Sequence, residues 1–268
     1  MAESPRLVFT GNVIVDIVMA VDRMPEPGGD VIASSSELTA GGGFNTMVAA
    51  QRDGLDVVFA GQYGTGMFGS IVRAAITDAG FELAQDGLPD VDSGYTIALV
   101  DASAERTFVT ARGAEGRLTR ADLDRVAVRE QDLVYVSGYS LAHPVNAESL
   151  PGWLEALPPR SRVLFDPSPL VETFAPALIE RILARTDILS TNAREARLMT
   201  GETISPPPLC CWLPGREGAP PSCATGRRAA GWCVPNRQAT RCWCPDCRCA
   251  RSTAMAPETP TAASSRQR

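Results

Sequence analysis

The chain has 268 residues, of which 44% are hydrophobic and 21% charged, with a formal net charge of −6 at pH 7. This is the composition of a soluble globular protein, long enough for one large α/β domain or two small ones. The acidic balance argues against a nucleic-acid-binding surface, no apolar run has the length of a membrane span, and the N-terminus (MAESPRLVFTG) does not resemble a signal peptide, so the sequence favours a cytoplasmic protein.

Strand-like and helix-like segments alternate from Leu7 to about Glu202. The first segments predict one or two β-branched strands broken near Gly11, a helix ending at Gly54, a strand, and a helix ending at Gly80. They cover residues 6–21, 44–54, 56–64 and 67–81.

The alternation continues further along the chain. A hairpin is expected to turn at residues 102–104, and a short helix to begin at Thr119, with Asp122 at capping-box spacing. The hairpin strands, this helix, three buried strands and a last helix cover residues 95–101, 105–111, 118–128, 132–138, 161–169, 184–192 and 193–201. Strands that alternate with helices predict an α/β fold with a parallel sheet covered on both faces.

The composition changes after Glu202. Residues 203–268 are dense in Pro, Gly and Arg, contain all eight cysteines of the chain, and have neither a helical nor a strand period. Prolines at this density prevent regular elements, and few apolar residues remain to form a core. We therefore predict an ordered unit at 1–202 and a mostly disordered, irregular tail at 203–268.

Four cysteines of the tail lie close together, at Cys242, Cys244, Cys247 and Cys249. A zinc site is one interpretation of this cluster. Zinc-binding motifs usually have two well-separated cysteine pairs, which C-x-C-x2-C-x-C lacks. We therefore predict no metal site in the cysteine tail.

Two polar features of the N-terminal half are candidates for ligand binding. Asp16 ends an apolar strand-like run, and its ionised carboxylate would accept hydrogen bonds from ligand hydroxyls. Three glycines at 41–43 precede a predicted helix and would let a ligand approach the backbone, with Asn45 near the helix start. The alternatives are an ordinary strand end and an ordinary glycine turn.

Further candidates follow the later strands. Asp166 is placed at the carboxyl end of a strand, the usual ligand edge of an open α/β sheet. Asn192 and Glu195 lie three residues apart around a strand-to-helix turn, where both could face one crevice and Glu195 could hold a hydrated Mg²⁺. Turn chemistry and N-capping are the alternative for these residues. His143, the only histidine, is interpreted as an ordinary loop residue.

In order and spacing, these pieces resemble the ribokinase-like (PfkB-type) carbohydrate kinases over about residues 6–202. The resemblance is carried by Gly-x4-Asp at 11–16, the glycine run before the first helix, the glycine-rich strand exit at 61–69, D-x-x-P at 166–169 and N-x-x-E at 192–195. It implies an α/β/α sandwich with a small β lid over the sugar. The implied lid consists of two parts. The first lies within 13–40, around 13–22 and 31–40, and the second lies around 94–112.

The resemblance also implies an activity and a site. Its members transfer phosphate from ATP, with Mg²⁺, to a hydroxyl of a small-molecule sugar or nucleoside. Arg112 would lie near the sugar or nucleoside that accepts the phosphate. Asn192 and Glu195 would be associated with Mg²⁺ and phosphate. The implied sugar-hydroxyl contacts are Asp16, Gly42, Gly43 and Asn45. A homodimer is compatible with the resemblance, because lid-mediated dimers occur among relatives.

The chain departs from the family pattern at several places. Gly66 stands where members often carry Asp, and Phe44 and Thr46 differ from common helix-start residues. No segment after Glu202 matches the family's D-T-x-G-A-G-D signature. In the family, that glycine-rich turn binds the transferring phosphoryl group and its last Asp deprotonates the sugar hydroxyl. We therefore assign no catalytic residue and expect impaired activity.

A displaced reading frame would account for the missing signature. When new codons are built from the last base of each codon and the first two bases of the next, residues 251–259 can encode V-D-x-x-G-A-G-D. Residues 223–229 can likewise encode the family-like R-D-G-A-A-G. Both readings require mostly G in third positions, in keeping with a chain whose 25 basic residues are all Arg. We interpret 203–268 as an out-of-frame tail.

Two alternatives belong to other functional classes. A non-catalytic sugar- or nucleoside-binding module could use the N-terminal site alone. A non-functional fragment is the other alternative, because a sheet that lacks its C-terminal strands and helices would expose apolar surface.

Overall fold

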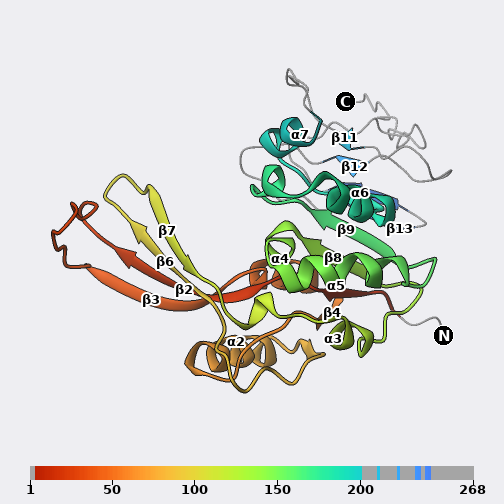
Figure 1. Ribbon diagram of the computed structural model, residues 1–268, viewed down its shortest axis with the longest axis horizontal. Helices are drawn as coiled ribbons and strands as arrows, with labels where there is room; N and C mark the ends of the chain where they lie inside the picture. Colours follow the sequence, from red (N-terminus) through yellow and green to blue (C-terminus); the bar gives the residue numbers. More distant parts are fainter. Residues whose placement is uncertain (1–3, 201–209, 212–221, 224–232, 237–238, 243–268) are drawn as a thin grey trace, which may run out of the picture.

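The computed structural model describes residues 4–200, with four short segments further on at 210–211, 222–223, 233–236 and 239–242. Within residues 4–200 the chain forms a layered body and a four-stranded sheet that extends away from it (Figure 1). No helix in these described parts is long and apolar enough to cross a membrane.

The body is organised around a six-stranded parallel sheet with the order β10-β9-β8-β1-β4-β5. The chain moves outward from β1 to β4 and β5 on one side, and then returns to β8, β9 and β10 on the other. The change of direction places a topological switch point between β1 and β8, where ligands bind in open α/β sheets. The strands are β1 Arg6–Phe9, β4 Asp56–Phe59, β5 Glu82–Leu83, β8 Leu133–Ser137, β9 Arg162–Asp166 and β10 Ile188–Leu189.

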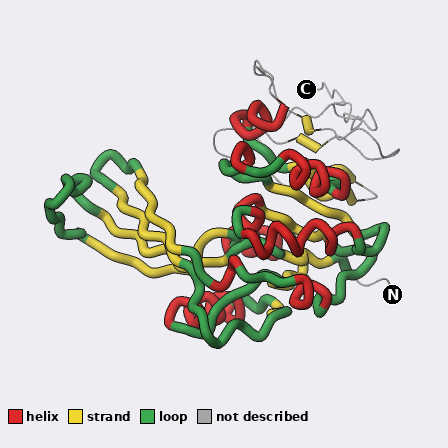
Figure 2. Tube along the Cα trace, viewed as in Figure 1, coloured by secondary structure: helices red, strands yellow, loops and turns green. Residues whose placement is uncertain are grey.

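Helices cover both faces of this sheet, which confirms the predicted α/β architecture (Figure 2). On one face α1 and α2 pack on Leu7 and Phe9 of β1, and on the other α3, α5 and α6 pack around Val8. The alternation follows from the two-residue period of a strand. The helices are α1 Phe44–Arg52, α2 Met67–Asp78, α3 Arg120–Asp124, α4 Gly138–Leu141, α5 Pro144–Glu155, α6 Pro176–Arg185 and α7 Ala193–Thr200, with 3₁₀ turns at Ala114–Gly116 and Val171–Thr173.

The second sheet has the order β3-β2-β6-β7 and extends well beyond the body (Figure 1). Its edge strands are the most exposed, β3 over its outer part and β7 over most of its length. Its inner end packs on α1 and α2 through Val13, Val15 and Ala40. The strands are β2 Val13–Ala20, β3 Ser35–Gly42, β6 Tyr95–Val100 and β7 Arg106–Ala111. We call this sheet, with its turns, the lid sheet.

Local signals in the sequence are confirmed at several turns. Gly54 and Gly80 end their helices with φ of +94° and +75°, and Ala104 turns the β6–β7 hairpin with φ of +63°. Thr119 and Asp122 form the expected capping box of α3. The glycine run differs from the prediction, because β3 continues through its first two members and only Gly43 caps α1.

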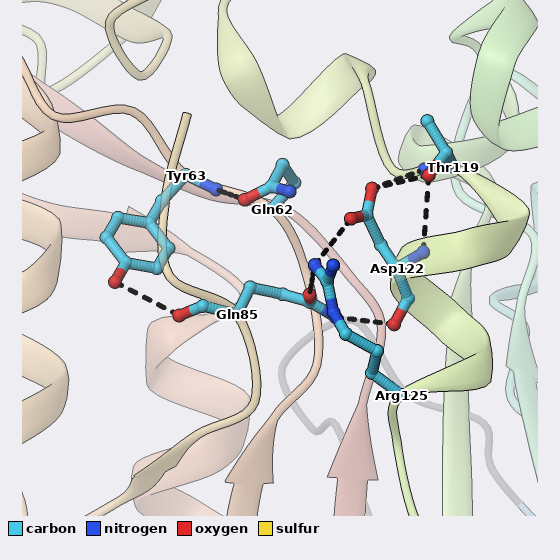
Figure 3. A network of polar contacts seen from close by, with 6 residues as sticks. All are labelled: Gln62, Tyr63, Gln85, Thr119, Asp122 and Arg125. Carbon is cyan, nitrogen blue, oxygen red and sulfur yellow. Dashed lines mark hydrogen bonds and ion pairs between the residues drawn. The ribbon is translucent and has the colours of Figure 1, made fainter. Parts of the chain in front are cut away.

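A buried polar network joins the segment after β5 to α3 (Figure 3). The Gln85 side chain donates to the carbonyl of Asp122 at 3.1 Å and accepts from Arg125 at 2.9 Å. The Tyr63 hydroxyl donates to the Gln85 carbonyl at 3.2 Å, and Gln62 accepts from the Tyr63 N–H at 3.0 Å. These bonds fix the segment between β5 and β6 to α3 and to the end of the β4 loop.

The unusual Gly66 at the start of α2 is compensated by a residue distant in sequence. Asp92 accepts the N–H groups of Phe68 at 3.0 Å and Gly69 at 2.7 Å, so its carboxylate caps the helix from outside. A Cβ at Gly66 would collide with Asp92. A side chain at the position of Gly66 would otherwise provide the cap. Because Gly66 has no side chain, it leaves room for the Asp92 carboxylate to cap α2 instead.

The tail contains two small antiparallel sheets among its described residues. The strands are β11 Cys210–Cys211, β12 Ser222–Cys223, β13 Cys233–Asn236 and β14 Ala239–Cys242. The sequence predicts no strand there, since such short pairs need no hydrophobic period. The remaining parts of the predicted disordered tail, and the cysteines at 244, 247 and 249, lie outside the described residues.

Candidate active site

A polar row crosses the inner part of the lid sheet. Asp16 of β2 pairs with Thr39 of β3 on one side and with Thr96 of β6 on the other, and Thr96 pairs with Thr110 of β7. Residues paired across strands point to the same face of a sheet. The hydroxyls of Thr96 and Thr110 lie 2.9 Å apart. This face therefore combines a carboxylate acceptor with hydroxyls that can donate.

Asp16 is held close to the glycine run. A Cβ at Gly41 would collide with the Asp16 carboxylate, so the glycine leaves the space that the side chain occupies. Partial burial raises the pKa of Asp16. No hydrogen bond to its carboxylate is found within the described part of the chain. A ligand hydroxyl would supply one and favour the ionised form.

The glycine turn closes tightly on the end of β1. Gly42 has φ of +60°, a conformation that favours glycine. Gly43 donates its N–H to the Asn12 carbonyl at 2.9 Å, and a Cβ there would collide with the Phe9 ring. The turn therefore brings backbone to the switch point and leaves Gly42 exposed.

The side chain of Asn12 connects this turn to α4 and α5. It accepts from the Ser140 hydroxyl at 2.9 Å, and its amide lies 3.3 Å from His143 Nε2. His143 is only 8% exposed and immediately precedes α5. His143 thus lies in the short connection between α4 and α5, as the sequence predicts, but it is buried there and contacts Asn12. Burial lowers the pKa of His143, the Glu115 charge opposes this change, and the charge of the nearby, exposed Arg112 at the end of β7 adds to it.

Asn192 and Glu195 form a capping box at the start of α7. Both Glu195 oxygens accept from Asn192, from its backbone N–H at 2.9 Å and from its side-chain amide at 2.6 Å. Asn192 Oδ1 in turn accepts the Glu195 N–H at 2.9 Å. The capping alternative is thus realised in the structure, and each carboxylate oxygen keeps a lone pair for another partner.

Asp166 lies beside this pair at the carboxyl end of β9. Its oxygens accept from the Tyr135 hydroxyl at 3.0 Å and from the Ser168 N–H at 3.1 Å. Ser168 has φ of +60°, a strained conformation for serine. Burial and the Asp166 charge raise the pKa of Tyr135, and the nearby Thr46 side chain in the first turn of α1 partly offsets that rise. The start of α1 therefore joins the glycine turn to the Asp166 side of the site.

Burial shapes the charges at this edge of the sheet. It raises the pKa of Asp166 and of Glu195, and the Asp166 charge raises the Glu195 pKa further. Carboxylate oxygens are the protein ligands that Mg²⁺ prefers, and a divalent cation would offset their repulsion. Within the described residues, no group of three or more His, Cys, Asp or Glu side chains could hold a metal. These residues fit a cation that takes its remaining ligands from water and phosphate.

The site residues named from the sequence fall into two groups that α1 connects. One group lies at the inner end of the lid sheet and comprises Asp16, Gly42, Gly43 and Arg112. The other comprises Asp166, Asn192 and Glu195, to which the structure adds Tyr135. Asn45 lies between them on α1, with an exposed side chain.

The buried histidine leads to a prediction about pH. Burial lowers the pKa of His143, so the unfolded chain binds more protons than the folded one below about pH 6.5, and stability rises with pH there. We expect the melting temperature of the wild type to fall more between pH 7.5 and pH 5.5 than that of His143→Gln. Glutamine keeps an acceptor for Asn12 but does not titrate in this range. Parallel pH profiles of the two proteins would contradict the prediction.

The architecture and this edge of the sheet together define an α/β protein of the ribokinase-like class. The family model described as pfkB family carbohydrate kinase matches residues 4–210, and the chain belongs to that family.

Individual relatives agree with the family match. The chain is 30% identical over 193 residues to the uncharacterized sugar kinase YegV of Escherichia coli K12, covering 72% of this chain and 59% of that protein. It is 24% identical over 203 residues to a ribokinase of Haemophilus influenzae, covering 74% and 63%. The chain thus spans about three fifths of the length of these relatives.

Solved structures show the same fold. The ribokinase of Giardia lamblia superposes with a TM-score of 0.62 at 25% identity, covering 75% of this chain and 62% of that one. The Arabidopsis thaliana ribokinase complexed with ribose and ATP gives a TM-score of 0.56 at 20% identity, covering 74% and 64%.

Proposed function

We propose that this chain carries the acceptor half of an ATP-dependent sugar kinase, which transfers phosphate to a hydroxyl of a small sugar or nucleoside. The observation that carries the proposal is the half-buried Asp16 carboxylate, without a hydrogen bond among the described residues, in a row with Thr96 and Thr110. Asp16 accepts hydrogen bonds from hydroxyl groups of the sugar or nucleoside. The Thr96–Thr110 pair has a hydroxyl proton that it can donate to the same molecule. In this proposal Gly42, Gly43 and Asn45 also contact the sugar or nucleoside.

The lid sheet covers the acceptor in this proposal, with segments 13–40 and 94–112, and Arg112 approaches the acceptor from its base. Excluding water there strengthens each charge interaction and prevents loss of phosphate to water. Cytoplasmic location belongs to the same proposal, because the reaction needs ATP. The exposed Leu38, Phe108 and Val109 of the lid sheet support association of two copies in a homodimer.

Asn192 and Glu195, with Asp166, form the phosphate side. When bound there, Mg²⁺ would neutralise phosphate charge and orient the transferring group. Glu195 and Asp166 are placed to hold its water ligands, while Asn192 keeps Glu195 in position.

The activity of the chain as it stands is impaired in this proposal. The sequence after Glu202 lacks the G-A-G-D turn and its base, and we propose a displaced reading frame as the cause. A non-catalytic sugar- or nucleoside-binding module is the second candidate, favoured by the acceptor-side residues within the described part of the chain. A fragment without function is the third.

Titration calorimetry tests the proposal with D-ribose, D-fructose and adenosine as probes. We expect one of them to bind, and Asp16→Asn to weaken that binding by about ten- to a hundredfold, because a hydrogen bond to a charged group is lost. Asp22→Asn, an exposed charge neutralisation at the end of the lid sheet, is the matched control. Absence of binding by every probe, or equal affinities of the two variants, would overturn the proposal.

A further inference from the structure

The lid sheet joins the body at four chain crossings, which converge on a small region. The crossings are at Asn12, at the glycine turn 42–43, at Gly94 before β6, and at Gly113 after β7. Gly94 and Gly113 are in contact, since a Cβ at Gly113 would collide with the Gly94 nitrogen. The two ends of the β6–β7 hairpin therefore meet where they enter the body.

One buried carboxylate binds both of these ends. Glu115 is 3% exposed, and it accepts the Gly94 N–H at 2.8 Å with one oxygen and the Gly113 N–H at 2.8 Å with the other. Both amides lie outside the strands, so the ladders of the lid sheet do not satisfy them. Buried backbone N–H groups need partners, and an ionised carboxylate is a strong one.

The loop that carries Glu115 is itself anchored to the body. The side-chain amide of Asn146 in α5 donates to the Glu115 carbonyl at 2.8 Å, and Asn146 Oδ1 accepts the Leu118 N–H at 2.9 Å. Gly116 lies against His143, because a Cβ there would collide with the imidazole. Glu115 therefore links the β6–β7 hairpin to α5.

We propose that Glu115 is a positioning residue that fixes the lid sheet on the body and thereby sets the place of Arg112 and the threonine pair over the acceptor. Arg112 stands between the end of β7 and Gly113, so the clamp determines where its backbone lies. The functional consequence rests on the proposed kinase site, whereas the clamp itself is tested without a ligand.

Glu115→Gln isolates the carboxylate at nearly unchanged volume. The glutamine oxygen accepts one N–H, and its NH₂ group faces the other N–H, so one of the two bonds is lost. Hydrogen–deuterium exchange of the full chain, read on overlapping peptides, should show exchange about ten- to a hundredfold faster at residues 92–95 and 112–114. Peptides from β8 and β9 should keep their wild-type rates.

Glu148→Gln, at an exposed position of α5, is the control for the charge change and should leave both regions unchanged. A uniform increase in exchange over lid sheet and body would assign Glu115 to general stability and overturn the proposal. Unchanged exchange at both glycines would also overturn it. If the exchange result holds while calorimetry finds no sugar binding, the clamp stands and the proposed kinase site fails.

Discussion

A version of this chain that continues beyond Glu202 in the proposed displaced reading frame should phosphorylate a sugar or nucleoside at least about 10³-fold faster than the present chain. The restored G-A-G-D turn would supply backbone N–H groups for the transferring phosphoryl group and a carboxylate to take the hydroxyl proton. A single oxyanion donor is worth roughly 10²–10³ in rate and a general base roughly 10²–10⁴. Asp16 and the threonine pair are common to both chains, so affinity for the acceptor should change much less.

An ATP-consumption assay with D-ribose, D-fructose and adenosine measures this difference. The control is the restored chain with Asn in place of the last Asp of G-A-G-D, which should bind the acceptor but turn it over slowly. The coding sequence from codon 195 onward provides a separate check, because the displaced frame must spell G-A-G-D around Met255. Robust turnover by the present chain would contradict the prediction.

Local sequence signals predict many of the elements in the described part of the chain. The β-branched runs gave β1, β2, β8 and β9, and glycines with positive φ marked the ends of α1 and α2. α5 was missed because Pro151 lies inside it and hides the helical period. α6 has a readable period, Pro176 at its start and Ile182 in the core, so that omission was not imposed by the sequence.

The site divides in the same way between local and long-range signals. Asn192 and Glu195 are neighbours in sequence, and their spacing predicted that they would lie together. Tyr135 bonds Asp166 across 31 positions, and Glu115 binds Gly94 across 21. Such pairs depend on strand order and on where the lid sheet joins the body, which no short motif contains.

The buried ion pair at the amino ends of the central strands β1 and β8 should make a large contribution to stability. Asp132 is 0% exposed and accepts from Arg6 Nη2 at 2.8 Å and from the Arg6 and Arg129 N–H groups at 3.3 and 2.9 Å. Asp132 directly precedes β8 and Arg6 begins β1, so the pair aligns the two strands that flank the switch point. Loss of one partner leaves a charge in a region from which water is excluded.

We expect Asp132→Ala to lower the free energy of unfolding by about 3–5 kcal/mol and the melting temperature by about 10 °C. Asp124→Ala, which breaks the exposed pair with Arg120, should cost less than about 1 kcal/mol. The double change Arg6→Met with Asp132→Leu should recover much of the loss, because it removes both charges and keeps apolar volume in their place. Equal melting of the two alanine variants would show that the buried pair is not what holds β1 and β8 in register.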